Sequence, residues 1–308
     1  MNQGLNCAKY NLVCWSIART NRKLMLAGSV VKFLLPALLI IFSFLAGCAS
    51  LEMANVNTAQ DQQNSKLELH SSLQTAREFA KQNPGSPDAH NQLALALAYL
   101  GKSDEAVEAY EFSLRLKPEQ PKVLTALGMV LVERHRPEEA IQRFRAATEL
   151  DPKDVLSRLH LALAYEQVGR FQEAEREFKK AAELRPQDSF LYLNLAMLYT
   201  RLDRKREAIS LLMKAIEANP DNVLARNNLG LAFARMGRLT EAVGQLERAV
   251  QIAPFDVATR VNLANLYEAQ GRLKEAQAQL EEALTLDPGF QSTRERLNQI
   301  KQKSRGSP

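Results

Sequence analysis

The apolar positions of this chain repeat with a period of 34 residues. When Pro87 is counted as position 1, position 7 is leucine in six successive copies, at Leu93, Leu127, Leu161, Leu195, Leu229 and Leu263. Position 8 is always alanine or glycine, and position 20 is always alanine. Positions 7, 8 and 11 share one helical face, whereas positions 20, 24 and 27 share another. Each copy therefore predicts two amphipathic helices.

Proline and glycine mark the ends of these helices. Prolines recur every 34 residues, at Pro84, Pro118, Pro152, Pro186, Pro220, Pro254 and Pro288. A proline has no N–H to donate and disfavours helix in the residue before it, so each second helix ends there. Position 15 is glycine in four copies, where the end of the first helix favours a residue that tolerates positive φ. The pattern predicts six helical hairpins.

This pattern resembles the tetratricopeptide repeat (TPR) family. The resemblance implies an all-α fold, a right-handed α-solenoid of six helix-turn-helix hairpins over residues 87–290. Residues 67–86 look like a degenerate half repeat, and residues 291–308 look like a C-terminal capping helix and tail. Position 4, often tryptophan in the family, is occupied here by His90, Leu124, Arg158, Tyr192, Arg226 and Arg260.

The N-terminal segment has a different character. Residues 33–45 form a nearly unbroken apolar run after Lys32, too short to span a bilayer comfortably. The run ends in Leu-Ala-Gly-Cys48, which resembles the lipobox of bacterial lipoproteins. By this resemblance, residues 1–47 are a signal peptide and the sulfur of Cys48 carries a lipid. An uncleaved membrane anchor is the alternative, and a translation start at Met25 would give a leader of more usual length.

The residues after Cys48 predict a tether and a location. Residues 48–66 are polar and lack apolar periodicity, as expected of a flexible tether. By resemblance to lipoproteins of enteric bacteria, the absence of an acidic residue at Ala49 and Ser50 favours the outer membrane, with the protein facing the periplasm. The periplasmic side of the inner membrane is the alternative.

The family resemblance also indicates where a partner would bind. In TPR proteins, positions 2, 5, 6, 9, 12 and 13 of the first helices line a concave groove. Position 6 is asparagine in the last three repeats, at Asn194, Asn228 and Asn262, with Asn227 and Asn265 nearby. This row is similar to the asparagine ladder that holds an extended peptide in O-linked N-acetylglucosamine transferases, since an amide can pair with both halves of a peptide unit. Amides that merely face water are the alternative.

Apolar residues occupy the middle of the same groove. They are Leu156, Leu159, Leu163, Phe190, Leu193 and Met197. We expect either a docking patch for apolar side chains of a partner or packing between adjacent first helices.

A further regularity joins position 16, which is always basic, to position 19, which is always glutamate. We interpret this pair as structural, because an acid in the first turn of a helix suits the helix dipole and a base three residues away can pair with it. A continuous basic ridge for acidic partners is the functional alternative.

Charge and composition narrow the functional classes. The net charge of +5 comes from five bases in residues 1–47, which contain no acid, so the remainder has 35 bases and 35 acids. A neutral body argues against nucleic-acid binding. The three cysteines all precede residue 49, and the four histidines stand apart in sequence without metal-ligand spacing. No catalytic motif is present, so we expect neither an enzyme nor a cofactor.

Together these features predict a membrane-tethered scaffold or adaptor that binds a protein or an extended peptide in the bacterial envelope. Relatives of this build imply assembly of a pilus, secretion, polysaccharide-export or cell-wall complex. The alternative is a non-catalytic regulatory or targeting subunit of an envelope enzyme, such as a polysaccharide synthase or a peptidoglycan hydrolase.

Overall fold

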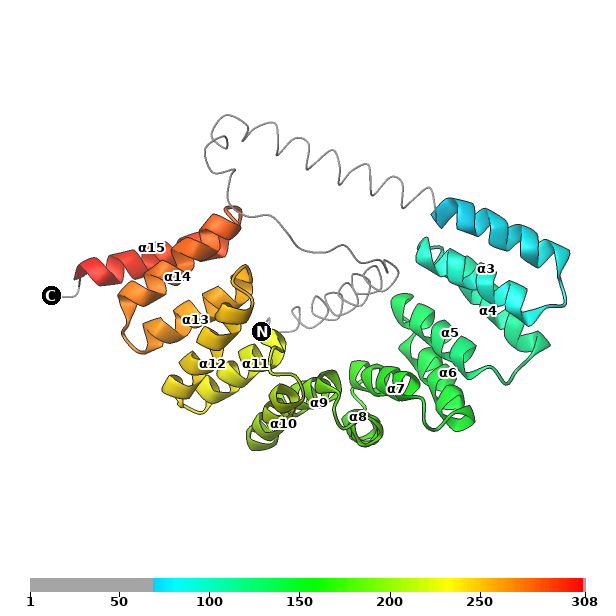
Figure 1. Cartoon of the computed structure of the whole chain (residues 1–308), viewed down its shortest axis with the longest axis horizontal. Helices are drawn as coiled ribbons and strands as arrows, with labels where there is room; N and C mark the ends of the chain where they lie inside the picture. The colour runs from blue at the N-terminus through cyan, green and yellow to red at the C-terminus, as the bar shows by residue number, and fades with distance from the viewer. Residues whose placement is uncertain (1–68, 307–308) are drawn as a thin grey trace, which may run out of the picture. The chain divides into compact units, whose positions relative to one another are not determined.

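The computed structural model describes residues 69–306, which form helices and no strand (Figure 1). A helix over residues 69–82 precedes six hairpins, each made of a first and a second helix. The first helices are α3 (Pro87–Tyr99), α5 (Pro121–Glu133), α7 (Val155–Gln167), α9 (Ser189–Arg201), α11 (Val223–Arg235) and α13 (Val257–Ala269). The second helices are α4 (Ser103–Leu116), α6 (Pro137–Leu150), α8 (Phe171–Leu184), α10 (Lys205–Ala218), α12 (Leu239–Ile252) and α14 (Leu273–Leu286). With α15 (Gln291–Gly306) after the last hairpin, the predicted all-α solenoid is confirmed.

Consecutive hairpins pack against each other along the chain. The second helix of one hairpin contacts the first helix of the next, as α6 contacts α7 and α10 contacts α11. Neighbouring first helices also contact each other directly, in the pairs α5 with α7, α9 with α11, and α11 with α13. The first helices therefore share one face of the stack, which we call the first-helix face.

The turn inside each hairpin takes its shape from position 15. Four glycines there have φ between 73° and 78°, whereas His135 and Asp203 adopt φ of 58° in the second and fourth hairpins. The N–H of position 16 then donates to the carbonyl of position 11, as Arg170 does to Tyr165 at 2.8 Å. This bond satisfies a carbonyl at the end of the first helix that has no partner within the helix.

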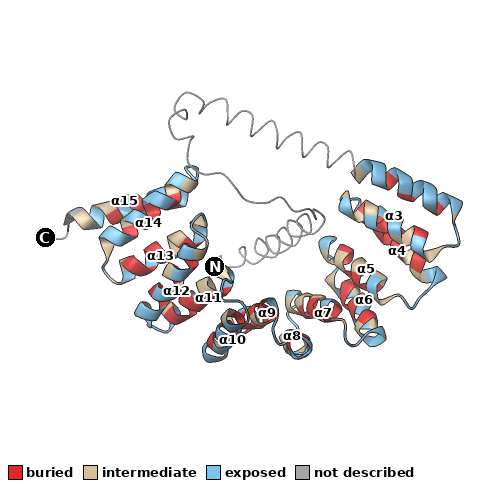
Figure 2. Ribbon diagram, in the orientation of Figure 1, coloured by how far each residue is buried: buried red, intermediate tan, exposed pale blue. Residues whose placement is uncertain are grey.

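The core lies between the two helices of each hairpin and between neighbouring hairpins (Figure 2). Leu127, Ala140 and Phe144 are fully buried there. A Cβ atom on Gly128, at position 8, would lie only 2.5 Å from Cε1 of Phe144. The small residue at this position therefore lets the second helix approach the first, as the sequence pattern predicted.

Helix α9 belongs to two clusters of buried residues. Leu191, Leu195 and Leu198 pack with the hairpins before it, and Leu193 and Ala196 pack with the hairpins after it. The apolar residues of α9 consequently join the two halves of the stack into one compact unit.

The predicted pairs of positions 16 and 19 are present in all six hairpins. Lys102 binds Glu105 at 2.8 Å, and Arg136, Arg170, Arg204, Arg238 and Arg272 bind the glutamates three residues later. The arginines of the last four of these pairs also lie over the aromatic ring at position 11, as Arg272 lies 4.2 Å from the ring centre of Tyr267. Each of these bases binds a glutamate of its own hairpin, and Arg204 also binds Glu175 of the preceding one, which supports the structural interpretation.

Helix α15 covers the end of the last hairpin. Its apolar residues Leu297 and Ile300 are buried, and α15 contacts α14. Arg296 and Lys303 both bind Glu268 of α13, at 2.5 Å and 2.6 Å. A largely polar helix thus shields the apolar side of α13 and α14 from water.

The predicted leader, the lipidation site at Cys48 and the tether lie outside the described residues. The described residues 69–306 belong to one compact unit. Within the described part, none of the helices combines the length and apolar character that a membrane crossing requires.

Candidate protein-binding face

Large apolar side chains remain exposed on the first-helix face. Leu156, Phe190 and Leu224 occupy position 2 of α7, α9 and α11, and they are 47%, 38% and 38% exposed. Position 9 follows two helical turns later on the same face, and Met197 there is also exposed. We call Leu156, Phe190 and Leu224 the position-2 row. Leu224 was missed by the sequence analysis, although it follows Phe190 by one repeat of 34 residues and that spacing is visible in the sequence.

Other members of the predicted apolar stripe serve the core. Leu193 is 2% exposed and packs within the cluster formed by α9 and the hairpins after it. Leu159 is also buried, and Leu163 is half-buried against the core. Leu159 and Leu193 therefore pack as the core interpretation predicted. Leu156, Phe190 and Met197 remain exposed, and docking of a partner on them stays a prediction.

The predicted asparagine row is partly engaged with the protein itself. Asn194 is only 9% exposed, and its Nδ2 donates to the carbonyl of Phe190 at 2.7 Å. Asn228 is half-buried and donates in the same way to Leu224 at 2.8 Å. Because the side-chain amide bonds the carbonyl four residues earlier, its Oδ1 is the atom left to accept a hydrogen bond from a ligand.

Further along the face, asparagines of two hairpins bind each other. Nδ2 of Asn262 donates to Oδ1 of Asn227 at 3.0 Å, which joins α13 to α11. Asn265, one turn after Asn262, is exposed and makes no hydrogen bond among the residues that the structure describes. The asparagines of this face are consequently concentrated on α11 and α13, whereas the position-2 row lies on α7, α9 and α11.

His160 replaces asparagine at position 6 of the third hairpin. Its ring stacks on Phe144 with the two centres 5.6 Å apart. Burial lowers the pKa of His160 to about 4, although Asp154 opposes the shift. The imidazole is therefore neutral at neutral pH and adds no charge to this part of the face.

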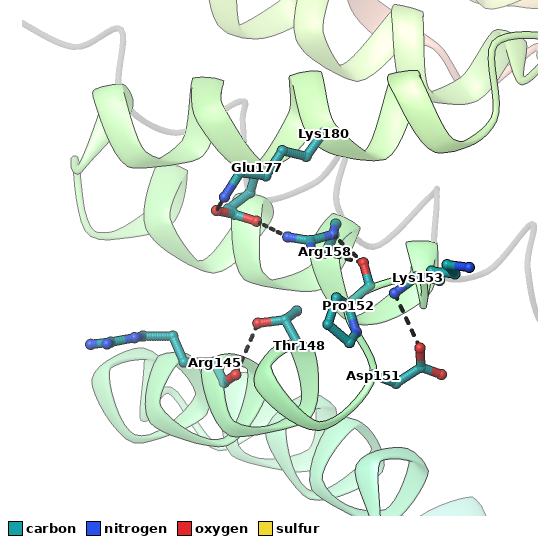
Figure 3. Close-up of polar contacts among 8 residues, drawn as sticks. All are labelled: Arg145, Thr148, Asp151, Pro152, Lys153, Arg158, Glu177 and Lys180. Atoms are coloured by element: carbon teal, nitrogen blue, oxygen red, sulfur yellow. Dashed lines mark hydrogen bonds and ion pairs between the residues drawn. The ribbon is translucent and has the colours of Figure 1, made fainter.

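The residue at position 4 has a role that the sequence analysis missed. Arg158 donates to the carbonyl of Pro152 through Nε at 3.0 Å and binds Glu177 through Nη1 at 2.8 Å (Figure 3). Its guanidinium therefore fastens the loop before α7 to the second helix of the same hairpin. The spacing of these residues in the sequence could have revealed this role. In three repeats an arginine follows a proline at one constant interval and precedes a glutamate or glutamine at another.

The same arrangement recurs in the fifth and sixth hairpins. Arg226 bonds the carbonyl of Pro220 and Oε1 of Gln245, and Arg260 bonds Pro254 and Gln279. Arginine thus takes the place that the family often gives to tryptophan, and it adds hydrogen bonds between the loop and the second helix. This position belongs to the scaffold rather than to the binding face.

A family model described as the C-terminal domain of cilia and flagella-associated protein 70, a domain of TPR type, matches residues 59–302. The match spans most of the chain. This chain belongs to the tetratricopeptide repeat family. No curated protein sequence matches the chain. Proteins of this family serve as scaffolds for protein–protein interaction, and the exposed position-2 row suits that role.

Two solved structures show the same fold. The C-terminal part of a TPR protein from Cytophaga hutchinsonii has a TM-score of 0.60 at 19% identity, covering 76% of this chain and 96% of that one. PilF of Pseudomonas aeruginosa has a TM-score of 0.58 at 17% identity, covering 69% of this chain and 97% of that one. Within residues 69–306, no group of three His, Cys, Asp or Glu side chains is placed to hold a metal ion.

Proposed function

We propose that this TPR protein is a membrane-tethered scaffold that holds an extended segment of a partner protein on its first-helix face. The position-2 row carries the proposal. Three large apolar side chains, each more than a third exposed, occupy equivalent places on α7, α9 and α11. Leaving such a row in water is unfavourable, and rows of this kind mark sites where a partner's side chains dock.

The polar groups beside the row favour an extended segment. Asn228 presents a side-chain carbonyl, and Asn227 and Asn265 present amide hydrogens that bond nothing in the described part of the protein. A main chain in extended conformation exposes N–H and C=O groups at regular intervals, and amides can bond both. The apolar row would then select the side chains, while the amides hold the backbone.

The leader and Cys48 support a tether in the bacterial envelope. An apolar run that ends in Leu-Ala-Gly-Cys resembles a lipoprotein signal, and the residues after Cys48 carry no acid until Glu52. We therefore place the protein at the outer membrane, facing the periplasm. Assembly of a pilus, secretion, polysaccharide-export or cell-wall complex is the setting we propose, and the fold shared with PilF of P. aeruginosa is compatible with it.

Crosslinking in cells tests the function. The test variant changes Leu156, Phe190 and Leu224 together to serine. The matched control changes Leu116, Leu150 and Leu184 to serine, since these leucines are similarly exposed and also recur once per repeat, but lie at the ends of second helices. We expect the test variant to lose the crosslinked partner at least tenfold while the control keeps it. Equal capture by both variants would overturn the proposal.

A further inference from the structure

Charges on the first-helix face follow a pairing rule between neighbouring hairpins. Position 12 of one first helix meets position 13 of the next first helix. Where these positions hold an acid and a base, the two side chains form an ion pair. Oε1 of Glu166 lies 3.5 Å from Nη1 of Arg201. Oε1 of Glu268 lies 2.6 Å from Nζ of Lys303, with α15 in the place of a next first helix.

Two charges at position 13 lack this partner. Arg235, the last residue of α11, would meet Thr200, whose hydroxyl donates to the carbonyl of Ala196 in its own helix. Glu133, the last residue of α5, would meet Ala98. Both side chains are exposed, and neither makes an ion pair or a hydrogen bond within residues 69–306. At position 13 the described part of the face therefore presents one unpaired acid and one unpaired base, three hairpins apart.

The position of Glu133 costs stability. The C-terminal end of a helix carries partial negative charge, so a carboxylate there is unfavourable unless a cation compensates it. Arg235 suits its helix end, but it has no counter-ion among the described residues. Because Arg235 follows Leu231 by one helical turn, its charge lies on the same side of α11 as the apolar position 9.

We propose that the segment bound on this face carries an acidic side chain that pairs with Arg235 and a basic side chain that pairs with Glu133. Other, large apolar residues of the same segment cover the position-2 row. The inference rests on the proposed function and gives the bound segment one orientation. The ligand of this face is a protein segment, because a nucleic acid or an anionic membrane presents negative charge only and would be repelled by Glu133.

Selection from a random library of linear peptides displayed on phage tests this inference with the full-length chain immobilised. The selected peptides are then measured against four variants by fluorescence anisotropy: Arg235→Glu, Glu133→Lys, the serine variant of the position-2 row, and Arg206→Glu. Arg206 is the matched control, because it is an exposed arginine on the second helix α10 with no ion pair or hydrogen bond among the described residues. Circular dichroism confirms that each variant remains folded.

We expect the peptides to contain an acidic residue, a basic residue and large apolar residues. They should bind Arg235→Glu and Glu133→Lys about tenfold more weakly and Arg206→Glu as tightly as the unchanged chain. Exchanging the acid for lysine in the peptide should restore binding to Arg235→Glu. If binding depends on the position-2 row but not on Arg235 and Glu133, the charge pairing is wrong and the proposed function stands. If binding depends on none of these residues, both are wrong.

Discussion

Nη1 of Arg158 lies 2.8 Å from Oε2 of Glu177, and both side chains are only 13% exposed. Because water reaches the pair poorly, removing the acid leaves the guanidinium charge uncompensated. We expect Glu177→Leu to lower the free energy of unfolding by about 2 to 3 kcal/mol. Glu177→Gln should cost only about 1 kcal/mol, since glutamine accepts the same bond from Arg226 and Arg260. Urea unfolding of the full chain measures both, and equal losses would contradict the explanation.

The contact between Gly128 and Phe144 predicts the effect of one added methyl group. Gly128→Ala would place a Cβ 2.5 Å from the ring of Phe144, which is fully buried and cannot move freely. We expect a loss of about 1 to 3 kcal/mol in the free energy of unfolding. Gly244→Ala is the control, because a Cβ there would meet nothing within 4 Å and alanine is the better helix former. A stabilised Gly128→Ala protein would refute the packing argument.

Glu175 makes stability depend on acid pH. Burial raises the pKa of Glu175, but hydrogen bonds from Lys179, Tyr199 and Arg204 outweigh it and lower that pKa to about 2 from its ordinary value of 4.5. The ionised carboxylate therefore stabilises the fold above about pH 4.5, and this contribution is lost as the pH falls toward 2.

The variant Glu175→Gln measures how much the ionised carboxylate of Glu175 contributes to the free energy of unfolding. At pH 7 we expect it to be about 2 kcal/mol less stable than the unchanged chain, and the difference should shrink toward zero near pH 2. Glu183→Gln on the same helix, where the carboxylate is exposed and has no ion pair in the described part, should show little difference at any pH. A Glu175→Gln deficit that is constant from pH 7 to pH 2 would show that the charge is not responsible.

The lipid anchor proposed at Cys48 predicts where the protein is found in cells. Cys48→Ala removes the thiol that would carry the lipid, so it should abolish incorporation of labelled fatty acid and block cleavage of the leader. The labelled protein is followed by fluorescence after gel electrophoresis, and Cys14→Ala serves as the control because it precedes the predicted cleavage site. Unchanged labelling of Cys48→Ala would exclude this residue as the lipid carrier.

The sequence was sufficient for the fold because each hairpin repeats the same local rules. Leucine at position 7, alanine at position 20 and the pairs of positions 16 and 19 all recur, and the structure places them as the period predicts. The binding face was less predictable. The spacing of Asn194 could not reveal that its amide bonds the carbonyl of Phe190, nor that Leu193 turns into the core, since both depend on how neighbouring first helices pack. That Arg235 has no counter-ion became visible only in the structure, where position 12 of the preceding first helix, which holds an acid in the paired cases, is Thr200.

The turn of every hairpin is closed by groups of that hairpin, from the carbonyl at position 11 to the glutamate at position 19. In the first and fourth hairpins, Arg77 and Glu175 of the preceding elements add an ion pair to it. The residues of a single repeat therefore determine its own turn. From its neighbours the repeat needs chiefly an apolar surface to pack against. Duplicating or deleting one such stretch in the gene would lengthen or shorten the array without rewriting the rest. The number of copies then becomes the means by which evolution adjusts how long a ligand the protein can hold.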